Sequence, residues 1–264
     1  MTTLYLGAAA IAVYASALIF HVLQLRKHPQ LPSTLLQVAT LTAIVFHSIT
    51  MVGLLLQGTD LDLSLVKILA LISLVVNFIV FISGLRKPLH NLYIFLFPIA
   101  VLTLLIALTG ETTKTTVLLS PQIQAHVLLS IVAYSLLAIA ALQALFVGYQ
   151  DFQLRNKHQN LLMRAFPPLQ TMEALLFEII WAGEVLLSLS LLSGFLFYES
   201  IFGQQLVHKV VFSLIAWTFY AVLLWGRHQK GWRGSTAIRL TWAGFVAILL
   251  GYIGSKFVLE ILLS

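Results

Sequence analysis

Three histidines fall where an imidazole nitrogen could bind a metal or a cofactor. His47 lies well inside one apolar segment, His126 opens another, and His208 begins a third beside Lys209. A neutral imidazole is tolerated in a membrane when its N–H meets a carbonyl or hydroxyl group, so His47 is either a satisfied core residue or a ligand or proton carrier. His126 is either a wet residue at the membrane surface or a side chain that reaches a cofactor lying there. His208 is typical of an interfacial anchor.

One acidic side chain inside an apolar segment is a further candidate. Glu184 lies deep in the sixth segment, whereas Glu173 and Glu178 lie in its first turns, where the helix dipole stabilises a carboxylate. Hydrocarbon penalises a charged side chain by about 3 kcal/mol or more, so Glu184 must be protonated, be paired or face a polar cavity. His47 is a possible partner, because both residues fall in the middle third of their segments. The structural and functional interpretations of Glu184 both stay open.

The composition of the chain indicates that these residues lie in a membrane protein, with lipid as the solvent of its surface. Of the 264 residues, 60% are hydrophobic and only 9% are charged, which is too few charges to cover a soluble protein of this size. The chain therefore predicts an all-α bundle of about eight transmembrane helices in a single integral membrane domain, residues 1–264, since most apolar segments approach the roughly 20 residues that span a bilayer. The segments cover approximately residues 4–23, 35–56, 65–83, 92–108, 126–149, 175–197, 207–225 and 238–262.

The distribution of charge predicts a topology. Most of the fifteen Lys and Arg residues fall in alternate connections, and the remaining connections carry mainly acidic residues. Cytoplasmic loops carry the excess of Lys and Arg, so both termini are predicted to face outward, into the periplasm. The net charge of +6 is thus a topology signal and gives no support for a nucleic-acid partner. Five further histidines lie near the basic side and are interpreted as interfacial or loop residues: His21, His28, His90, His158 and His228.

Several classes of chemistry are excluded by missing motifs. The chain has no cysteine, which excludes disulfides and thiolate metal sites. It also has no phosphate-binding glycine loop, no H-E-x-x-H motif and no nucleophile elbow. The spacing Ser190-x-x-x-Gly194 predicts close packing between helices and does not indicate a catalytic or binding role. Whether the protein is an enzyme stays uncertain, and the sequence favours a protein that is not an enzyme.

A set of motifs in the second half of the chain carries a family resemblance. In chain order they are His126-Val127 with Tyr134, Leu169 to Glu173, Ala182-Gly183, Ser193-Gly194, Ser213-Leu-Ile-Ala-Trp217 with Tyr220, Gly231-Trp232-Arg233-Gly234, and Gly244 to Gly251-Tyr252. Over residues 124–256 the chain resembles the cytochrome c assembly family. That family includes CcsA, CcmC and HemX-like haem-handling membrane proteins, and the resemblance is greatest to its YpjD-like inner-membrane branch.

The resemblance implies a function. It implies a multi-pass protein of the bacterial inner membrane that binds or escorts haem near the external face, as a carrier more than a catalyst. His126 matches the family's external haem-ligating histidine, and His47 matches a transmembrane histidine that holds haem in transit. No metal other than the haem iron is implied. The partners implied are the lipid bilayer, haem and a membrane protein.

One part of the family pattern is missing. The tryptophan-rich external motif is expected between the sixth and seventh segments, but residues 198–207 contain no tryptophan. His208 is then the available substitute for a second external histidine. The missing motif leaves an alternative open: a non-haem accessory or regulatory subunit of another membrane complex, such as a transporter. A secondary transporter that uses Glu184 as a proton site is a third hypothesis.

Overall fold

The structure is a computed structural model, and it describes residues 2–27, 34–57, 60–62, 64–110, 116–117, 121–157, 166–197 and 204–251. The chain divides into two compact units. Unit 1 comprises Met1–Leu118 with Gln159–Pro167, and unit 2 comprises Leu119–His158 with Pro168–Ser264. Each unit is built from long apolar helices and is considered by itself.

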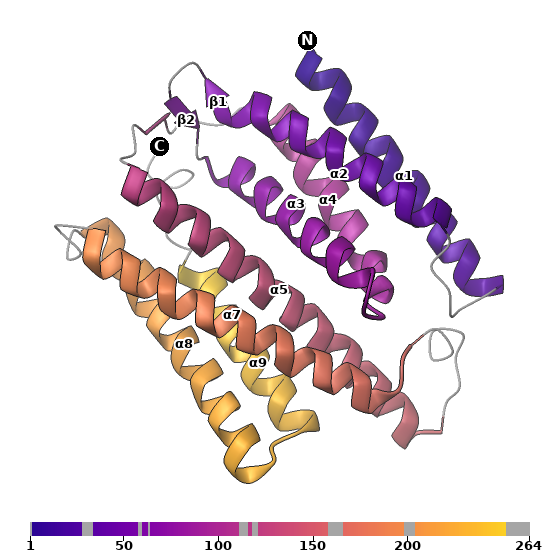
Figure 1. Ribbon diagram of the computed structural model, residues 1–264, viewed down its shortest axis with the longest axis vertical. Helices are drawn as coiled ribbons and strands as arrows, with labels where there is room; N and C mark the ends of the chain where they lie inside the picture. The colour runs from indigo at the N-terminus through magenta and orange to yellow at the C-terminus, as the bar shows by residue number, and fades with distance from the viewer. Residues whose placement is uncertain are drawn as a thin grey trace. The chain divides into compact units, whose positions relative to one another are not determined.

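Unit 1 is a helical bundle (Figure 1). Its helices are α1 (Thr2–Lys27), α2 (Thr34–Leu55), α3 (Leu65–Gly84), the 3-10 helix η1 (His90–Leu92) and α4 (Tyr93–Thr109). α1 packs against α2 and α4, and α3 packs against α4 and α2. Gly7 allows the close approach of α1, since a Cβ there would lie 2.6 Å from a methyl carbon of Leu108 on α4. Pro98 lies inside α4 without ending it, as packed membrane helices permit.

Three very short strands accompany the helices of unit 1 in the described residues. They are β1 (Leu56–Gln57), β2 (Asp60–Asp62) and β3 (Thr116–Val117), and they form an antiparallel sheet in the order β1-β2-β3. Leu61 lies opposite both Leu56 and Val117. The sequence does not predict this sheet, because the strands are too short to carry a pattern of alternating polarity.

Unit 2 is also a helical bundle (Figure 1). Its described helices are α5 (Pro121–Arg155), α7 (Leu169–Phe197), α8 (Gln204–Lys230) and α9 (Gly234–Leu249). α5 lies along α7 over most of its length, α7 packs against α8, and α9 packs against α8 and α5. Leu137, Leu176, Ile180 and Tyr220 are among the fully buried residues of the shared core. The helices therefore surround a common apolar centre.

The predicted all-α architecture is confirmed. In the described part of the chain, seven helices are long and apolar enough to cross a membrane, and α9 is a shorter apolar helix. The predicted eighth segment continues to residue 262, and residues 252–264 lie outside the described residues. The outward orientation of the termini and the single integral domain stay predictions.

Candidate functional site

His126 lies near the start of α5, where its half-buried imidazole faces α7. Its Nδ1 atom lies 2.9 Å from the hydroxyl oxygen of Ser193. The next residue of α7 is Gly194, and a Cβ added there would lie 3.1 Å from Cε1 of the imidazole, which is closer than an ordinary carbon–carbon contact. Ser193 therefore holds one edge of the ring, and the missing side chain of Gly194 leaves room for it.

Serine hydroxyl groups join α5 and α7 beside this histidine; Ser130, Ser190 and Ser193 together are called the serine seam. The hydroxyl oxygens of Ser130 and Ser190 lie 2.7 Å apart. The Ser130 hydroxyl also lies 2.7 Å from the carbonyl oxygen of His126. The Ser193 hydroxyl donates to the carbonyl oxygen of Ser190 at 2.8 Å. Small hydroxyl side chains let two membrane helices approach closely while their polar groups satisfy each other.

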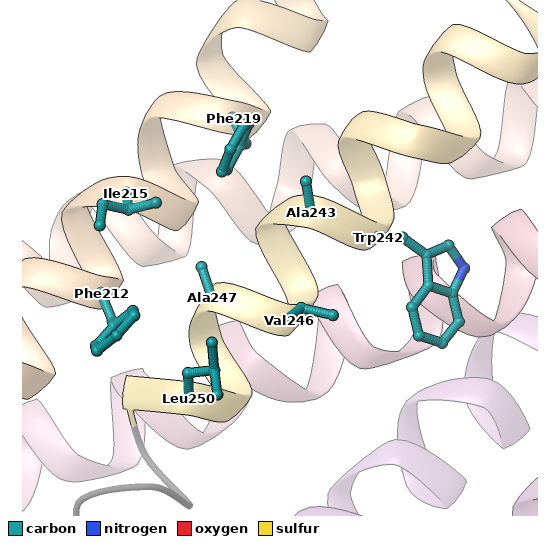
Figure 2. Close-up of a pocket in the computed structure, with 8 residues that line it drawn as sticks. All are labelled: Phe212, Ile215, Phe219, Trp242, Ala243, Val246, Ala247 and Leu250. Carbon is teal, nitrogen blue, oxygen red and sulfur yellow. The ribbon is translucent and has the colours of Figure 1, made fainter.

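His208 lies in the second turn of α8, and its side chain is exposed. One turn further along the helix, Phe212 begins the wall of a groove between α8 and α9 (Figure 2). The groove has a volume of about 430 Å³ and is lined by Phe212, Ile215, Phe219, Trp242, Ala243, Val246, Ala247 and Leu250. Residues spaced by three or four positions share a helix face, so His208 stands at one end of this apolar groove.

His126 and His208 belong to the same end of unit 2. The hydroxyl oxygens of Tyr134 on α5 and Ser213 on α8 lie 3.3 Å apart. α5 and α8 run in the same direction, because each is antiparallel to α7. At a rise of 1.5 Å per residue, His126 lies about 12 Å beyond Tyr134, and His208 lies about 7.5 Å beyond Ser213, in the same direction. We call this end of the unit the histidine end.

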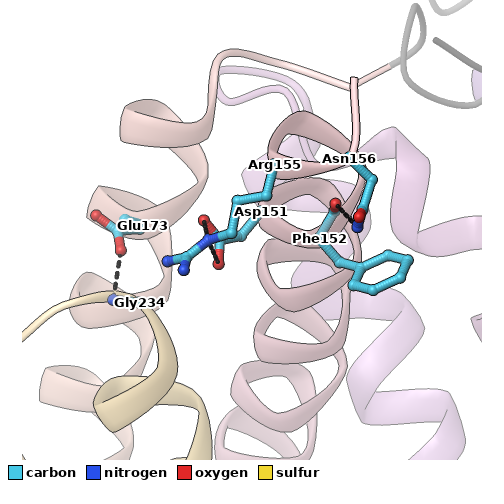
Figure 3. Close-up of polar contacts among 6 residues, drawn as sticks. All are labelled: Asp151, Phe152, Arg155, Asn156, Glu173 and Gly234. Carbon is cyan, nitrogen blue, oxygen red and sulfur yellow. Dashed lines mark hydrogen bonds and ion pairs between the residues drawn. The ribbon is translucent and has the colours of Figure 1, made fainter. Parts of the chain in front are cut away.

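The opposite end of unit 2 is called the basic end, and it carries Arg155, Lys157, Arg227, Lys230 and Arg233. There Nε of Arg155 lies 3.0 Å from the carboxylate of Asp151, one turn earlier on α5. Glu173, in the first turns of α7, accepts a hydrogen bond at 2.8 Å from the backbone N–H of Gly234, the first residue of α9 (Figure 3). Ion pairing and capping therefore organise this end.

The turn between α8 and α9 is fixed by Arg227. Its Nη1 donates to the carbonyl oxygen of Trp232 at 3.2 Å, and its guanidinium carbon lies 4.5 Å from the centre of the Phe177 ring on α7. Gly231 has a φ of 64°, a conformation that residues with a Cβ rarely adopt. The Gly-Trp-Arg-Gly motif that the sequence singles out is thus a joint between three helices, and packing accounts for it.

Glu184 lies on the buried face of α7. The residue is 7% exposed, and neither carboxyl oxygen has a hydrogen-bond partner among the described residues. Its helix neighbours Ile180 and Leu187 belong to the apolar core. His47 belongs to unit 1, so the pairing of the two residues stays a prediction. Within unit 2, Glu184 has unmet hydrogen-bonding capacity in a core that is apolar apart from groups such as the nearby phenol of Tyr220.

His47 lies at the centre of unit 1, with 0% of its side chain exposed. Its Nδ1 lies 3.5 Å from the hydroxyl oxygen of Tyr14 on α1, and the two rings meet edge to face at 5.9 Å between centroids. Nε2 has no hydrogen-bond partner in the described part of the chain. His47 is therefore a buried imidazole that is only weakly satisfied.

An aromatic row continues from this pair through unit 1. Tyr14 contacts Phe97, Phe97 stacks on Tyr93 at 4.7 Å, and Tyr93 meets His21 edge to face at 6.2 Å. His21 is 2% exposed, and the backbone of His90 lies within hydrogen-bonding reach of its ring. Sequence interpretation assigned His21 to the interface, since it falls near the end of its apolar segment. Its burial by Tyr93 could not be seen from that position alone.

Long apolar helices make up most of the described chain and define a multi-pass helical membrane protein. Among the described residues, no three His, Cys, Asp or Glu side chains gather where they could hold a metal ion. The profile of the family described as Cytochrome C assembly protein matches residues 35–263, so the chain belongs to the cytochrome c assembly protein family. The resemblance found in the sequence is confirmed.

Individual relatives agree with this assignment. Inner membrane protein YpjD of Escherichia coli K12 is 32% identical over 228 residues, which cover 85% of this chain and 86% of the relative. Cytochrome c biogenesis protein CcsA of Prochlorococcus marinus MIT 9301 is 32% identical over 115 residues, covering 42% and 37% of the two chains. No solved structure matches significantly. The relative named as an inner membrane protein and the apolar helices confirm the predicted location: this is a multi-pass inner membrane protein.

Proposed function

We propose that this protein binds haem at its histidine end and holds or escorts it during cytochrome c assembly. Membership of the cytochrome c assembly protein family supports a role in that process. The relative named as a cytochrome c biogenesis protein supports the same assignment. The protein acts as a carrier in this proposal: its histidines would coordinate the haem iron, and its side chains make or break no covalent bond of the porphyrin or of a cytochrome.

The observation that carries the proposal is the setting of His126. Haem would supply an iron that binds imidazole nitrogen, and His126 is the residue that would hold it. The imidazole of His126 is half-buried and is held at Nδ1 by Ser193, with Gly194 leaving space beside it. An imidazole that is fixed at one nitrogen and lies at the end of a membrane helix suits axial ligation, because little further ordering is needed on binding.

The groove between α8 and α9 supports the same function. Its volume of about 430 Å³ lies within the roughly 300–1,000 Å³ of small-molecule sites, and its walls are aromatic and aliphatic. Such walls suit the flat apolar ring of a porphyrin. His208, at the end of the groove and at the same end of unit 2 as His126, is the candidate for a second ligand.

His47 has a lesser part in the proposal. Its ring is packed against Tyr14 with no exposed surface. A macrocycle bound at Nε2 would have to displace the side chains that bury this ring, so ligation at His47 requires separation of the helices of unit 1. The packed ring of His47 therefore does not fit haem in this structure, and the proposal places the haem site at His126.

The proposal is tested by titrating hemin into the full-length protein in detergent micelles and following the Soret absorbance. We expect a saturable Soret band in the wild-type protein and at least a tenfold loss of affinity in His126→Ala. His228→Ala is the matched control, because His228 is an exposed histidine at the basic end of the same unit. Equal hemin affinity in the two variants, or no specific binding by the wild-type protein, would overturn the proposal.

A second function is favoured by one feature of the sequence. Residues 198–207, which follow α7 and include the first residues of α8, contain no tryptophan, although the family resemblance predicts a tryptophan-rich motif there. A chain that kept the fold without this motif fits an accessory subunit of another membrane complex. That function predicts stable co-purification with an integral membrane partner, together with no hemin binding in the titration above.

A further inference from the structure

We propose that Ser193 is a positioning residue for His126. Its hydroxyl group determines which ring nitrogen carries the hydrogen, and it thereby makes Nε2 the ligand atom. The identity of the ligand rests on the proposed haem function. The choice of tautomer is a property of the protein alone and can be tested without haem.

The argument begins with the single hydrogen of the Ser193 hydroxyl. That hydrogen is donated to the carbonyl oxygen of Ser190 at 2.8 Å, on the preceding turn of α7. The same oxygen lies 2.9 Å from Nδ1 of His126. A hydroxyl has one donor and two acceptor positions, so towards the histidine Ser193 can only accept. The proposal therefore places the imidazole hydrogen on Nδ1, which donates it to the Ser193 oxygen.

The tautomer of His126 follows from this bond. A neutral imidazole has one protonated nitrogen and one bare nitrogen. With the hydrogen on Nδ1, the bare nitrogen is Nε2, on the far side of the ring from Ser193. Metal-binding histidines are commonly fixed in this way, by a hydrogen bond from the nitrogen that does not bind the metal. Free histidine prefers the opposite tautomer, so the protein must stabilise the Nδ1–H tautomer.

The rest of the serine seam keeps Ser193 in place. Ser130 and Ser190 meet at 2.7 Å, one turn away from the His126–Ser193 contact, and they tie α5 to α7 at that level. Gly194 leaves space for the imidazole, since a side chain there would press on Cε1 of the ring. The imidazole can neither move towards α7 nor turn over without breaking its bond to Ser193. The backbone of Ser190 also hydrogen-bonds the imidazole, and in the proposal Ser193 acts together with it to set the orientation and the tautomer of His126.

Nitrogen-15 NMR of histidine-labelled protein without haem tests the tautomer directly. The His126 signals are assigned by their absence in His126→Gln, and protonated and bare ring nitrogens are well separated in such spectra. We expect the Nδ1–H tautomer in the wild-type protein and a shift towards Nε2–H in Ser193→Ala. Ser193→Thr keeps the hydroxyl group, whose oxygen can make the same bond within a helix, and should restore the wild-type spectrum.

Ser188→Ala is the matched control on the same helix. Ser188 also donates to a carbonyl oxygen one turn earlier, that of Glu184, at 2.8 Å, but the group it accepts from is Nε1 of Trp217. Its loss should leave the His126 tautomer unchanged. An Nε2–H tautomer in the wild-type protein, or the same tautomer in wild type and Ser193→Ala, would overturn the inference.

Hemin titration of the same variants separates this inference from the proposed function. We expect affinity to fall about 10- to 100-fold in Ser193→Ala, as is usual when a hydrogen-bond partner of a metal ligand is removed. Ser193→Thr and Ser188→Ala should bind like the wild type. If no variant binds hemin, the proposed function fails while the NMR result still decides the tautomer. If Ser193→Ala changes the tautomer but not the hemin affinity, Ser193 does not position a haem ligand.

Discussion

Glu173 of α7 caps α9 at a distance in sequence: its carboxylate accepts a hydrogen bond at 2.8 Å from the backbone N–H of Gly234, 61 residues later. The first turn of a helix has N–H groups without partners in the helix and carries the positive end of the helix dipole. Arg233, the residue before α9, makes no side-chain bond to that turn. The carboxylate from α7 supplies the missing acceptor and joins the two helices.

Removal of this cap should destabilise unit 2. We expect Glu173→Ala to lower the free energy of unfolding by about 1 kcal/mol, a typical value for loss of a helix N-cap. Unfolding in mixed detergent micelles, followed by tryptophan fluorescence, measures the change. Asp151→Ala removes an exposed ion pair with Arg155, whose side chain is 74% exposed, and should cost less than about 0.5 kcal/mol. A cost for Glu173→Ala no larger than that of this control would contradict the capping role.

Two glycines of α7 should respond differently to the same substitution. In Gly183→Ala the new methyl group would lie 2.6 Å from a methyl carbon of Leu137, inside the core, so we expect a loss of about 1–3 kcal/mol of stability from overpacking. In Gly194→Ala it would meet the His126 ring at 3.1 Å, near the end of the helix. We expect that variant to keep its stability but to bind hemin more weakly. The free energy of unfolding and the hemin affinity are measured for both variants. Equal changes of both quantities in the two variants would refute the prediction.

The contact between Tyr14 and His47 should contribute little to stability. Its atoms lie 3.5 Å apart, beyond the usual range of a hydrogen bond, and Nε2 of His47 has no partner among the described residues. Replacement of both polar groups by apolar ones can be neutral or stabilising. We expect the double variant Tyr14→Phe/His47→Leu to unfold with at least the wild-type free energy. A double-mutant cycle in micelles measures the coupling, which should stay below about 0.5 kcal/mol, whereas a larger value would show a strong bond.

Substitution of Glu184 tests whether its buried carboxyl group stabilises or destabilises the fold. Its carboxyl oxygens have no hydrogen-bond partner within the described chain, and such a group typically costs about 1–3 kcal/mol when it is desolvated. Glu184→Met, which fills a similar volume without polar atoms, should therefore raise the thermal midpoint of the purified protein. A lower midpoint would show that Glu184 has a partner, from another part of the chain or another molecule. The transporter hypothesis would then gain support.

The transmembrane architecture could be predicted because hydropathy is a property of each segment alone. The position of α4 agrees with its apolar segment to within one residue at each end, even with Pro98 inside it. α5 is longer than its predicted segment at both ends, and its carboxyl end carries Asp151 and Arg155, which are charged and lie outside the apolar run. Local composition thus identifies spans more reliably than it identifies the ends of helices.

The contacts of the candidate site were less predictable, for a physical reason. Lipid is as apolar as a helix surface, so hydropathy does not indicate which helix faces which neighbour. The spacing of Ser190 and Gly194 predicts a close contact, and the structure gives its partners as Ser130 and His126. Nothing in the sequence pairs His126 with Ser193, which lies 67 residues away. The burial of His21 likewise depends on Tyr93, a residue of another helix.

The length of α5 determines how deep His126 lies in the bilayer. From His126 to Asp151 the helix rises about 37 Å, and about 35 Å remain after a tilt of 20°, whereas the hydrocarbon layer is about 30 Å thick. Asp151 and its exposed partner Arg155 belong in water or among headgroups. His126 must then lie at the level of the opposite headgroups. In the proposed function, haem would therefore reach His126 from the aqueous phase without first dissolving in the membrane interior.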